Sequence, residues 1–174
     1  SRPPTLPNED CLADIQQAGM VILQENGFVQ YEVSAFALAG NMSRHNINYW
    51  QFGDYLGIGA GAHGKITVPA DNTVVRTTKT RLPAHYLARD GSALASKKSI
   101  ANAEIALEFM MNGLRLKQGV PTAYLPERTG LATSAIGAQI FSLQSKGLME
   151  SDSERYQTTA LGYQFLNTVL QGFD

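Results

Sequence analysis

RHNINYWQFGDYLGIGAGAHG, residues Arg44 to Gly64, is the stretch from which the organisation of this 174-residue chain is deduced. Its first half places His45 four and five residues before Tyr49 and Trp50, so a planar ligand bound at one atom by the imidazole can be stacked along its face. Its second half, Tyr55 to Gly64, predicts a short buried strand followed by a backbone with few side chains. A ligand can approach such a backbone closely.

The residues alone leave two interpretations of this stretch open. In one, His45 binds iron through its imidazole and a neighbouring amide orients the ring. In the other, His45, Asn46 and Asn48 only hydrogen-bond the loop, while Tyr49 and Trp50 fill the end of a barrel. Because one histidine is a weak signal, the spacing by itself favours the second interpretation.

Composition bounds the classes of protein to consider. The chain is 44% hydrophobic, which allows one good core or two small ones, and its net charge of −1 predicts no strong attraction to nucleic acid or anionic membranes. Cys11, the single cysteine, excludes an internal disulfide and cannot hold an iron–sulfur cluster. Without a signal peptide or an apolar run of about 20 residues, a cytoplasmic protein is expected. The start at Ser1–Pro7 resembles a loop, so we expect a fragment of a longer protein.

The first half of the chain predicts a helix, a strand, a long loop and a second strand. Asn8 is a suitable N-cap for a helix that ends near Asn26-Gly27. This order is typical of the last repeats of an α/β barrel, whose ligand sites lie at the carboxyl ends of the strands. We expect a strand at residues 28–33 and a loop at residues 34–43. A hairpin is then expected, with strands at residues 65–68 and 73–77 and a turn at residues 69–72.

The second half predicts a helical module. A short helix at residues 83–90 and a polar connection at 91–98 are expected to end the first domain, so we divide the chain into residues 1–97 and 98–174. Ser99 is expected to cap a central helix that is stopped by Gly119 and Pro121. Further helices at 121–128 and 133–146, a hairpin joining 148–150 to 155–157, and a last helix capped by Thr159 suggest a winged-helix-like domain.

Other candidate residues each have an ordinary structural interpretation. Glu32 either points into a barrel or is solvated on a strand, and the latter is commoner for a lone glutamate. Arg76, Lys79 and Arg81, with His85 nearby, either pair with carboxylates of a ligand or form a solvated hairpin face, which we favour. The helix at 133–146 carries one positive charge, too few for nucleic-acid binding. The sequence contains no motif typical of a catalytic nucleophile or of a zinc site, so neither kind of catalysis is predicted.

The central stretch also carries a family resemblance. The segments Tyr31–Ala37, Arg44–Trp50 and Gly53–Gly64, and with them Arg76–Arg81, resemble the HemW family of heme chaperones, radical S-adenosylmethionine (SAM) proteins related to oxygen-independent coproporphyrinogen III oxidase. The resemblance extends over nearly the whole chain. It implies a C-terminal portion: the last strands of a partial TIM-like α/β barrel followed by the winged-helix-like domain, an α+β arrangement in this fragment.

The resemblance also implies ligands and roles. His45 becomes the expected ligand to heme iron, Asn46 the residue that orients it, and Tyr49 and Trp50 the walls of the heme pocket. The glycine-rich run matches neither a dinucleotide fingerprint nor a P-loop. The resemblance implies that this run lies beside SAM, and the other interpretation is tight packing of small residues at a strand end. The expected SAM residues are Gly59, Gly61, Ala62 and His63.

The resemblance further implies a [4Fe-4S] cluster in the full-length protein, held by residues outside this fragment, and transfer of heme to acceptors such as respiratory enzymes. A homodimer and peripheral membrane association through these client proteins are compatible with it. We expect a chaperone rather than an enzyme. Two alternatives stay open: a full-length protein that acts as a coproporphyrinogen III oxidase, and a C-terminal domain that serves only as a docking module for client proteins.

Overall fold

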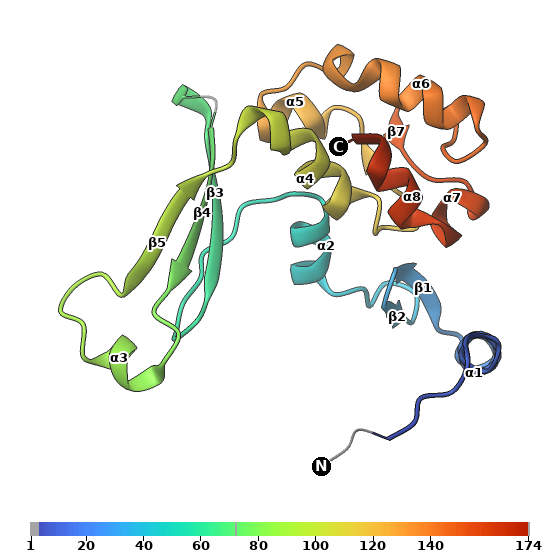
Figure 1. The fold of residues 1–174 in the computed structure, drawn as a ribbon, viewed down its shortest axis with the longest axis horizontal. Coiled ribbons are helices and arrows are strands. Elements are labelled where there is room, and N and C mark those ends of the chain that lie inside the picture. Colours follow the sequence, from blue (N-terminus) through green and yellow to red (C-terminus); the bar gives the residue numbers. More distant parts are fainter. Residues whose placement is uncertain (1–3, 72, 174) are drawn as a thin grey trace. The chain divides into compact units, whose positions relative to one another are not determined.

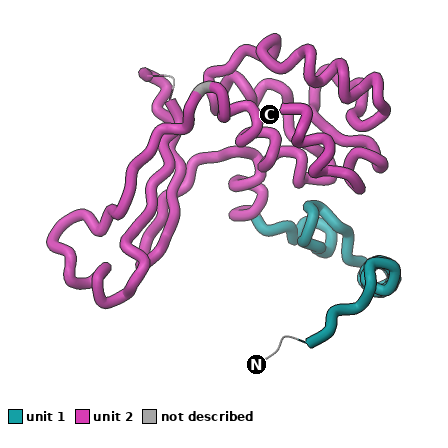
Figure 2. The backbone as a smooth tube through the Cα atoms, in the orientation of Figure 1, with its two compact units in different colours: residues 1–43 teal, residues 44–174 magenta. Residues whose placement is uncertain are grey.

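The fold is described from a computed structural model, in which residues 4–71 and 73–173 are described. The chain is mixed α/β and forms two compact units, residues 1–43 and 44–174, shown in different colours in Figure 2. Residues 1–3 of the expected N-terminal loop and Asn72 of the expected hairpin turn lie outside the described residues. Within the described ranges, no helix is long and apolar enough to cross a membrane.

The first unit is a helix followed by a small hairpin. Helix α1 (Glu9–Glu25) begins as predicted, because the Asn8 side chain accepts a hydrogen bond of 2.9 Å from the backbone N–H of Cys11. Strand β1 (Val29–Glu32) pairs antiparallel with β2 (Ala35–Ala37). The prediction of a continuous loop from residue 34 to 43 is therefore wrong at β2, because the chain turns back on itself at residues 33 and 34.

The second unit contains a three-stranded antiparallel sheet in the order β3-β4-β5 (Figure 1). The predicted hairpin is confirmed as β3 (His63–Val68) and β4 (Thr73–Lys79), joined through η1 (Pro69–Asp71). Helix α3 (Pro83–Leu87) follows as expected. The polar connection expected at 91–98 is instead mostly strand β5 (Leu94–Ser99), because its backbone pairs with β4.

Two further predictions for the central stretch are corrected. The residues around His45 form a helix, α2 (Arg44–Trp50), rather than a loop. The buried strand expected from Tyr55 is reduced to a single antiparallel bridge between Tyr55 and Lys65, with backbone hydrogen bonds of 2.9 Å in both directions. The alternating glycines after Tyr55 explain this, because they take φ values of +101° at Gly59 and +72° at Gly61, outside the range of a strand.

Helices make up most of the remaining chain. Ser99 ends β5, so the central helix begins later than predicted, with Ala101 as its N-cap. Strand β7 pairs with β6, whereas residues 148–150 pair with the residues that follow β7, through a bridge from Met149 to Thr158 and a hydrogen bond from the Glu150 N–H to the Gln157 carbonyl. Thr159 caps the next helix as predicted. The elements are α4 (Asn102–Gly113), β6 (Val120–Pro121), α5 (Tyr124–Thr129), η2 (Thr133–Ile136), α6 (Gly137–Ser145), β7 (Arg155–Tyr156), α7 (Ala160–Gln164), α8 (Leu166–Leu170) and η3 (Gln171–Phe173).

The core of the second unit is one cluster centred on α4, which contacts α2, α5 and α8 (Figure 1). The core is fully buried at Phe109 and Met110 of α4 and at Leu114, which follows the last residue of this helix. The cluster also includes Phe52 and Val74, which precede the predicted boundary between residues 97 and 98. That boundary falls inside β5 and stays a prediction. The four strand pairs of the described residues are all antiparallel.

Candidate functional site

Helix α2 presents two different faces. Ile47 and Trp50, three residues apart, pack against the core cluster. His45 is exposed, and Tyr49, one turn further along the helix, is half-buried. Because residues four apart share a helix face, the imidazole and the phenol ring lie on one accessible side of α2. This is the side on which an external ligand can meet His45.

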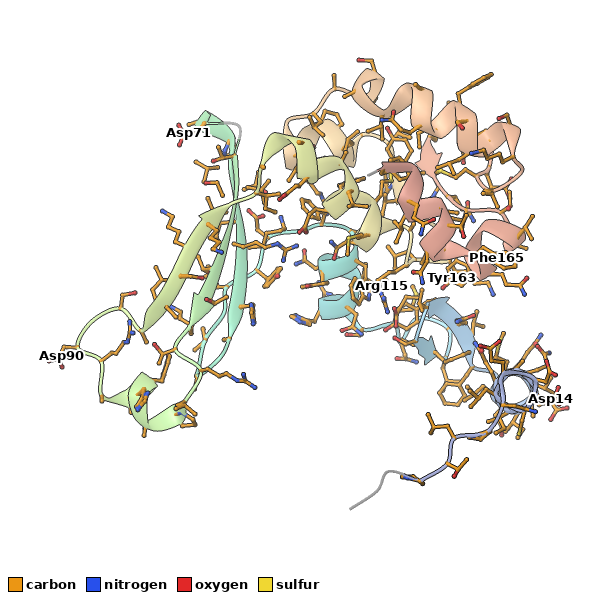
Figure 3. All side chains as sticks on the ribbon, in the orientation of Figure 1. Asp14, Asp71, Asp90, Arg115, Tyr163 and Phe165 are labelled. Atoms are coloured by element: carbon orange, nitrogen blue, oxygen red, sulfur yellow. The ribbon has the colours of Figure 1, made fainter. Side chains whose placement is uncertain are left out.

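The aromatic residues of the stretch form a packed cluster. The Tyr49 ring lies 4.8 Å from the Trp50 ring in an edge-on arrangement and 5.0 Å from the Tyr55 ring. The Arg115 guanidinium covers one face of Trp50, with 4.3 Å between the Arg115 Cζ and the ring centroid. Trp50 is thus part of the packing between α2 and the end of α4. The backbone carbonyl of Arg115 in turn accepts a hydrogen bond of 3.0 Å from the Tyr163 hydroxyl (Figure 3).

The two asparagines of α2 differ in their surroundings. Asn46 is half-buried whereas His45 is exposed, and adjacent residues of a helix do not face each other. Its predicted role in orienting His45 stays a prediction. Asn48, which the second interpretation expected to hydrogen-bond the loop, donates a hydrogen bond of 3.0 Å from Nδ2 to the carbonyl of Asp54. The Asn48 carbonyl also accepts from the N–H of Gly53 at 2.8 Å, so Asn48 closes the turn that follows α2.

That turn has an unusual backbone. Phe52, which is 1% exposed, has a φ of 60°, a left-handed conformation that costs free energy in a residue with a Cβ. Gly53 is required at the next position, because a Cβ there would lie 2.8 Å from the Asn48 carbonyl oxygen. The turn directs the aromatic ring of Phe52 into the core, where it lies 5.6 Å from the Phe109 ring.

A charged network holds the turn against strand β3. Lys65 is 2% exposed, and its ammonium lies 2.9 Å from Oδ1 of Asp54 and 4.2 Å from the centroid of the Phe52 ring. Thr67 donates to the same carboxylate twice, from its backbone N–H at 2.9 Å and its hydroxyl at 2.8 Å. On the other side, Arg128 of α5 donates to the Gln51 carbonyl at 2.5 Å.

The pKa values of this network follow from its contacts. Burial would raise the pKa of Asp54, but hydrogen bonds from Lys65 and Thr67 outweigh it and lower the pKa below 3.8. Burial lowers the pKa of Lys65, and the attraction of Asp54 only partly opposes it. Burial, followed by the neighbouring Tyr49, raises the pKa of Tyr55 to about 12, against the opposing effect of Arg76. The phenol of Tyr55 is therefore neutral near neutral pH.

The glycine-rich run divides into closed and open positions. At Gly57, an added Cβ would lie 2.3 Å from the His63 carbonyl oxygen, and at Gly64 it would lie 2.6 Å from the Thr77 hydroxyl. These two glycines allow close packing within the protein. At Gly59 nothing lies within 4 Å of an added Cβ, whereas at Gly61 it would be in ordinary contact with Arg81, at 3.8 Å. A ligand can therefore approach the backbone at Gly59.

The predicted SAM residues lie beside the end of β4 and α3. The N–H of Gly59 donates to the Tyr86 hydroxyl at 3.3 Å, and the N–H of Gly61 donates to the Thr80 carbonyl at 2.9 Å. Both polar groups of the Ala62 backbone are used internally, since its N–H donates to Gly59 and its carbonyl accepts from Lys79. His63 is exposed at the start of β3.

The remaining candidates are placed as follows. The favoured interpretation of Arg76 as a solvated hairpin residue is wrong, because its guanidinium forms an ion pair with Glu108 of α4. Lys79 is half-buried, and Arg81 is exposed. His85 is also exposed, on α3.

Glu32 is 2% exposed, so the solvated interpretation of that residue is also wrong. One of its carboxylate oxygens accepts hydrogen bonds from the backbone N–H and the hydroxyl of Ser34, at 3.0 and 2.9 Å. Across residues 4–71 and 73–173, no group of three or more His, Cys, Asp or Glu side chains is arranged to hold a metal ion.

Comparison with known proteins confirms the family resemblance. Residues 100–165 match the family described as HemN C-terminal domain. The chain is 41% identical over 173 residues to the heme chaperone HemW of Escherichia coli (strain K12) and 43% identical to that of Haemophilus influenzae. Each alignment covers 99% of this chain but only 45% and 44% of the respective relative, so the chain spans less than half of their length.

A more distant relative also matches this chain, and a solved structure shares its fold. The mitochondrial radical S-adenosyl methionine domain-containing protein 1 of Bos taurus is 30% identical over 94% of this chain and 39% of its own length. Among solved structures, the radical SAM enzyme coproporphyrinogen III oxidase (HemN) of Escherichia coli is similar with a TM-score of 0.67, over 97% of this chain and 42% of that one. At 18% identity, this likeness concerns the fold alone.

Proposed function

We propose that this chain is the C-terminal part of a heme chaperone that binds heme and delivers it to acceptor proteins. The proposal is supported by the match to the C-terminal portion of the heme chaperone HemW over 99% of this chain. The single observation that supports heme binding best is the exposed imidazole of His45 on the open side of α2. A ligand to heme iron must be reachable by a large flat molecule. His45, which is exposed, meets that requirement.

Within this proposal, His45 supplies an axial nitrogen to the heme iron. Tyr49 lies one turn along the same helix side and contributes a wall of the pocket. Trp50, one face of which is covered by Arg115, supports Tyr49 from the side rather than stacking on the porphyrin. Lys79 and Arg81 are the cations of the hairpin left for the heme propionates, since Arg76 is paired with Glu108. Asn46 is kept as the residue that orients His45.

For the full-length protein we propose SAM and a [4Fe-4S] cluster as further cofactors. The open backbone at Gly59 fits close approach by an adenosyl group, and Gly61 is kept as a neighbouring residue of the proposed site. His63, exposed nearby, is the proposed side-chain contact, and Ala62 borders the site. The cluster ligands are assigned to residues outside this chain.

The finer structural and cellular assignments are also proposals. We assign residues 1–97 to the end of a partial α/β barrel and residues 98–174 to a winged-helix-like domain. Respiratory enzymes are the proposed acceptors, in the cytoplasm or at the membrane surface to which such clients bring the chaperone. The proposal allows a homodimer. The oxidase alternative has less support, since the relatives with 41–43% identity are heme chaperones and the oxidase structure shares 18%.

The experiment that tests the proposal is a hemin titration of the full-length protein. We expect His45→Ala to weaken heme binding and to remove the spectroscopic signature of an imidazole-ligated iron, because the axial nitrogen is lost. Far-ultraviolet circular dichroism should stay unchanged, because His45 is exposed and makes no core contact. His85→Ala, an exposed histidine on α3, is the matched control. Wild-type and His45→Ala titrations that coincide would contradict the proposal.

A further inference from the structure

Helix α2 is too short to fix its own position. It has seven residues, whereas isolated helices shorter than about 12 residues are marginal in water. Its direction must therefore come from tertiary contacts. Ile47 and Trp50 attach one side of it to the core, and the turn at residues 51–54 attaches its C-terminal end. What fixes that turn also decides where the side chains on the open side of α2 point.

The turn is held by the ammonium group of Lys65, a charge whose burial is unfavourable unless it is paired. A lysine with 2% exposure is rare in a protein and needs a partner with a negative charge. Asp54 supplies that charge at 2.9 Å and is itself held by both donors of Thr67. The ammonium also lies over the face of the Phe52 ring, the residue with the left-handed backbone.

The network contacts α2 through Asn48. The backbone carbonyl of Asp54 accepts the side-chain hydrogen bond of Asn48, which lies three residues after His45 on α2. A second connection runs to α5, because the Arg128 guanidinium donates a hydrogen bond to the carbonyl of Gln51, the residue after α2. The end of α2 is thus tied both to β3 and to α5.

We propose that Lys65 is a positioning residue for heme binding: paired with Asp54, it fixes the turn after α2 and thereby the direction in which His45 and Tyr49 are presented. Lys65 itself touches no heme in this proposal. The inference rests on the proposed function, because it assigns the buried pair a role in the same site. Orienting residues of this kind change the affinity of the site they support by about 10-fold to 100-fold when removed.

The test compares Lys65→Met with wild type in the full-length protein by hemin titration. Methionine keeps the length and removes the charge. We expect at least about a 10-fold weaker affinity for hemin and a smaller fraction of imidazole-ligated iron in the absorption and electron paramagnetic resonance spectra. Lys65→Arg, which keeps the cation, should recover part of the ligated fraction.

Two controls separate positioning from stability and from net charge. Val169→Ala removes buried volume from α8, an element that contributes no residue to the turn or to its network, and it should lower the melting temperature while leaving the ligated fraction unchanged. Lys97→Met makes the same charge change at an exposed position of β5 and should leave both unchanged. If Lys65→Met lowers the melting temperature but keeps wild-type hemin affinity and spectra, the positioning role is overturned.

A second variant keeps the test decisive if Lys65→Met does not fold. Thr67→Val preserves shape and removes the hydroxyl hydrogen bond to Asp54, so it should reduce the ligated fraction in the same direction. An unchanged fraction in a folded Thr67→Val protein would then overturn the inference. Failure of the proposed function looks different, because wild type and His45→Ala would already give the same titration before any change at Lys65.

Discussion

Asp54 is the residue at which pH should act on the stability of this fold. Its carboxylate accepts hydrogen bonds from Lys65 and from both donors of Thr67, and these lower its pKa below the ordinary value of 3.8. A carboxyl with a lowered pKa in the folded state stabilises that state above its unfolded pKa. The contribution is lost as the pH falls from 3.8 through the lower folded value.

We therefore expect Asp54→Asn to lower the free energy of unfolding near neutral pH, with the difference from wild type shrinking in acid. Urea unfolding of both proteins between about pH 7 and about pH 2 measures this difference. The effect should be modest, because the Asp54 side chain is 43% exposed and solvent screens it. Glu104→Gln, at an exposed position of α4, serves as the charge control. A difference that stays constant across the range would contradict the role of this ionisation.

The sequence made some residues candidates for the site and gave no signal for others. His45 and Tyr49 became candidates through the family resemblance, since their spacing by itself favoured the interpretation without a ligand, and their roles stay predictions. Lys65 could not be found, since its burial depends on Asp54, 11 residues away, and on the left-handed backbone of Phe52. Neither feature leaves a local signal, because an isolated lysine between Gly64 and Ile66 has the appearance of an exposed strand residue.

At the scale of elements, the sequence predicted the features that depend on interactions between residues close together in the chain. The cap of α1 by Asn8 and that of α7 by Thr159 were predicted, because each is a side chain bonded within three residues. Strand β5 was missed, since its sequence LASKKS is polar and it exists through pairing with β4. Strand β7 was given the wrong partner for the same reason, because β6 lies more than 30 residues earlier.

The link between the sheet and α4 gives a prediction at this scale. Arg76 of β4 forms an ion pair with Glu108 of α4, and both side chains are about two-thirds buried. Burial opposes the charge of Arg76, but Glu108 outweighs it and raises its pKa. Glu108→Gln should therefore lower the free energy of unfolding by about 1 kcal/mol, because a partly buried cation loses its partner.

A double-mutant cycle with Arg76→Met measures whether this loss comes from the pair. The double variant should be destabilised by less than the sum of the two single variants, with both followed by urea unfolding. Glu127→Gln, at an exposed position of α5, is the control for charge alone. Strictly additive effects would mean that the sheet and α4 are held together by other contacts.

At the scale of the whole molecule, the order of the predicted elements suggested barrel repeats. In the described residues the strands pair only in antiparallel fashion, as hairpins and as the β6–β7 pair. Which strands pair is a non-local property, so the element order did not specify it. The predicted boundary at residue 97 also relied on local polarity, whereas Phe52 and Val74 share one core with α4. Deleting residues 98–174 would remove that core, so a deletion cannot isolate a docking role.

The shared core predicts that residues 44–174 unfold together. Phe109 is fully buried, with its ring 5.6 Å from Phe52 and 6.4 Å from Tyr156, so it joins the segment after α2 to the C-terminal helices. We expect Phe109→Ala to lower the free energy of unfolding by about 3–5 kcal/mol, through lost burial and the cavity left behind. Trp50, the single tryptophan of the chain, reports on α2 by fluorescence.

In thermal unfolding of the 174-residue chain, the Trp50 fluorescence transition and the far-ultraviolet circular dichroism transition should both move down in temperature and should still coincide. Coincidence is expected for the dichroism of the helices from α4 to α8, which pack with Trp50 on the same cluster, whereas α1 belongs to the first unit and can add a separate change. Phe141→Ala, on the outer side of α6 and 72% exposed, should leave both transitions in place. If Phe109→Ala shifts the dichroism while Trp50 keeps its wild-type midpoint, α2 folds independently of the helical core, and its position would have to be set by the turn at residues 51–54 alone.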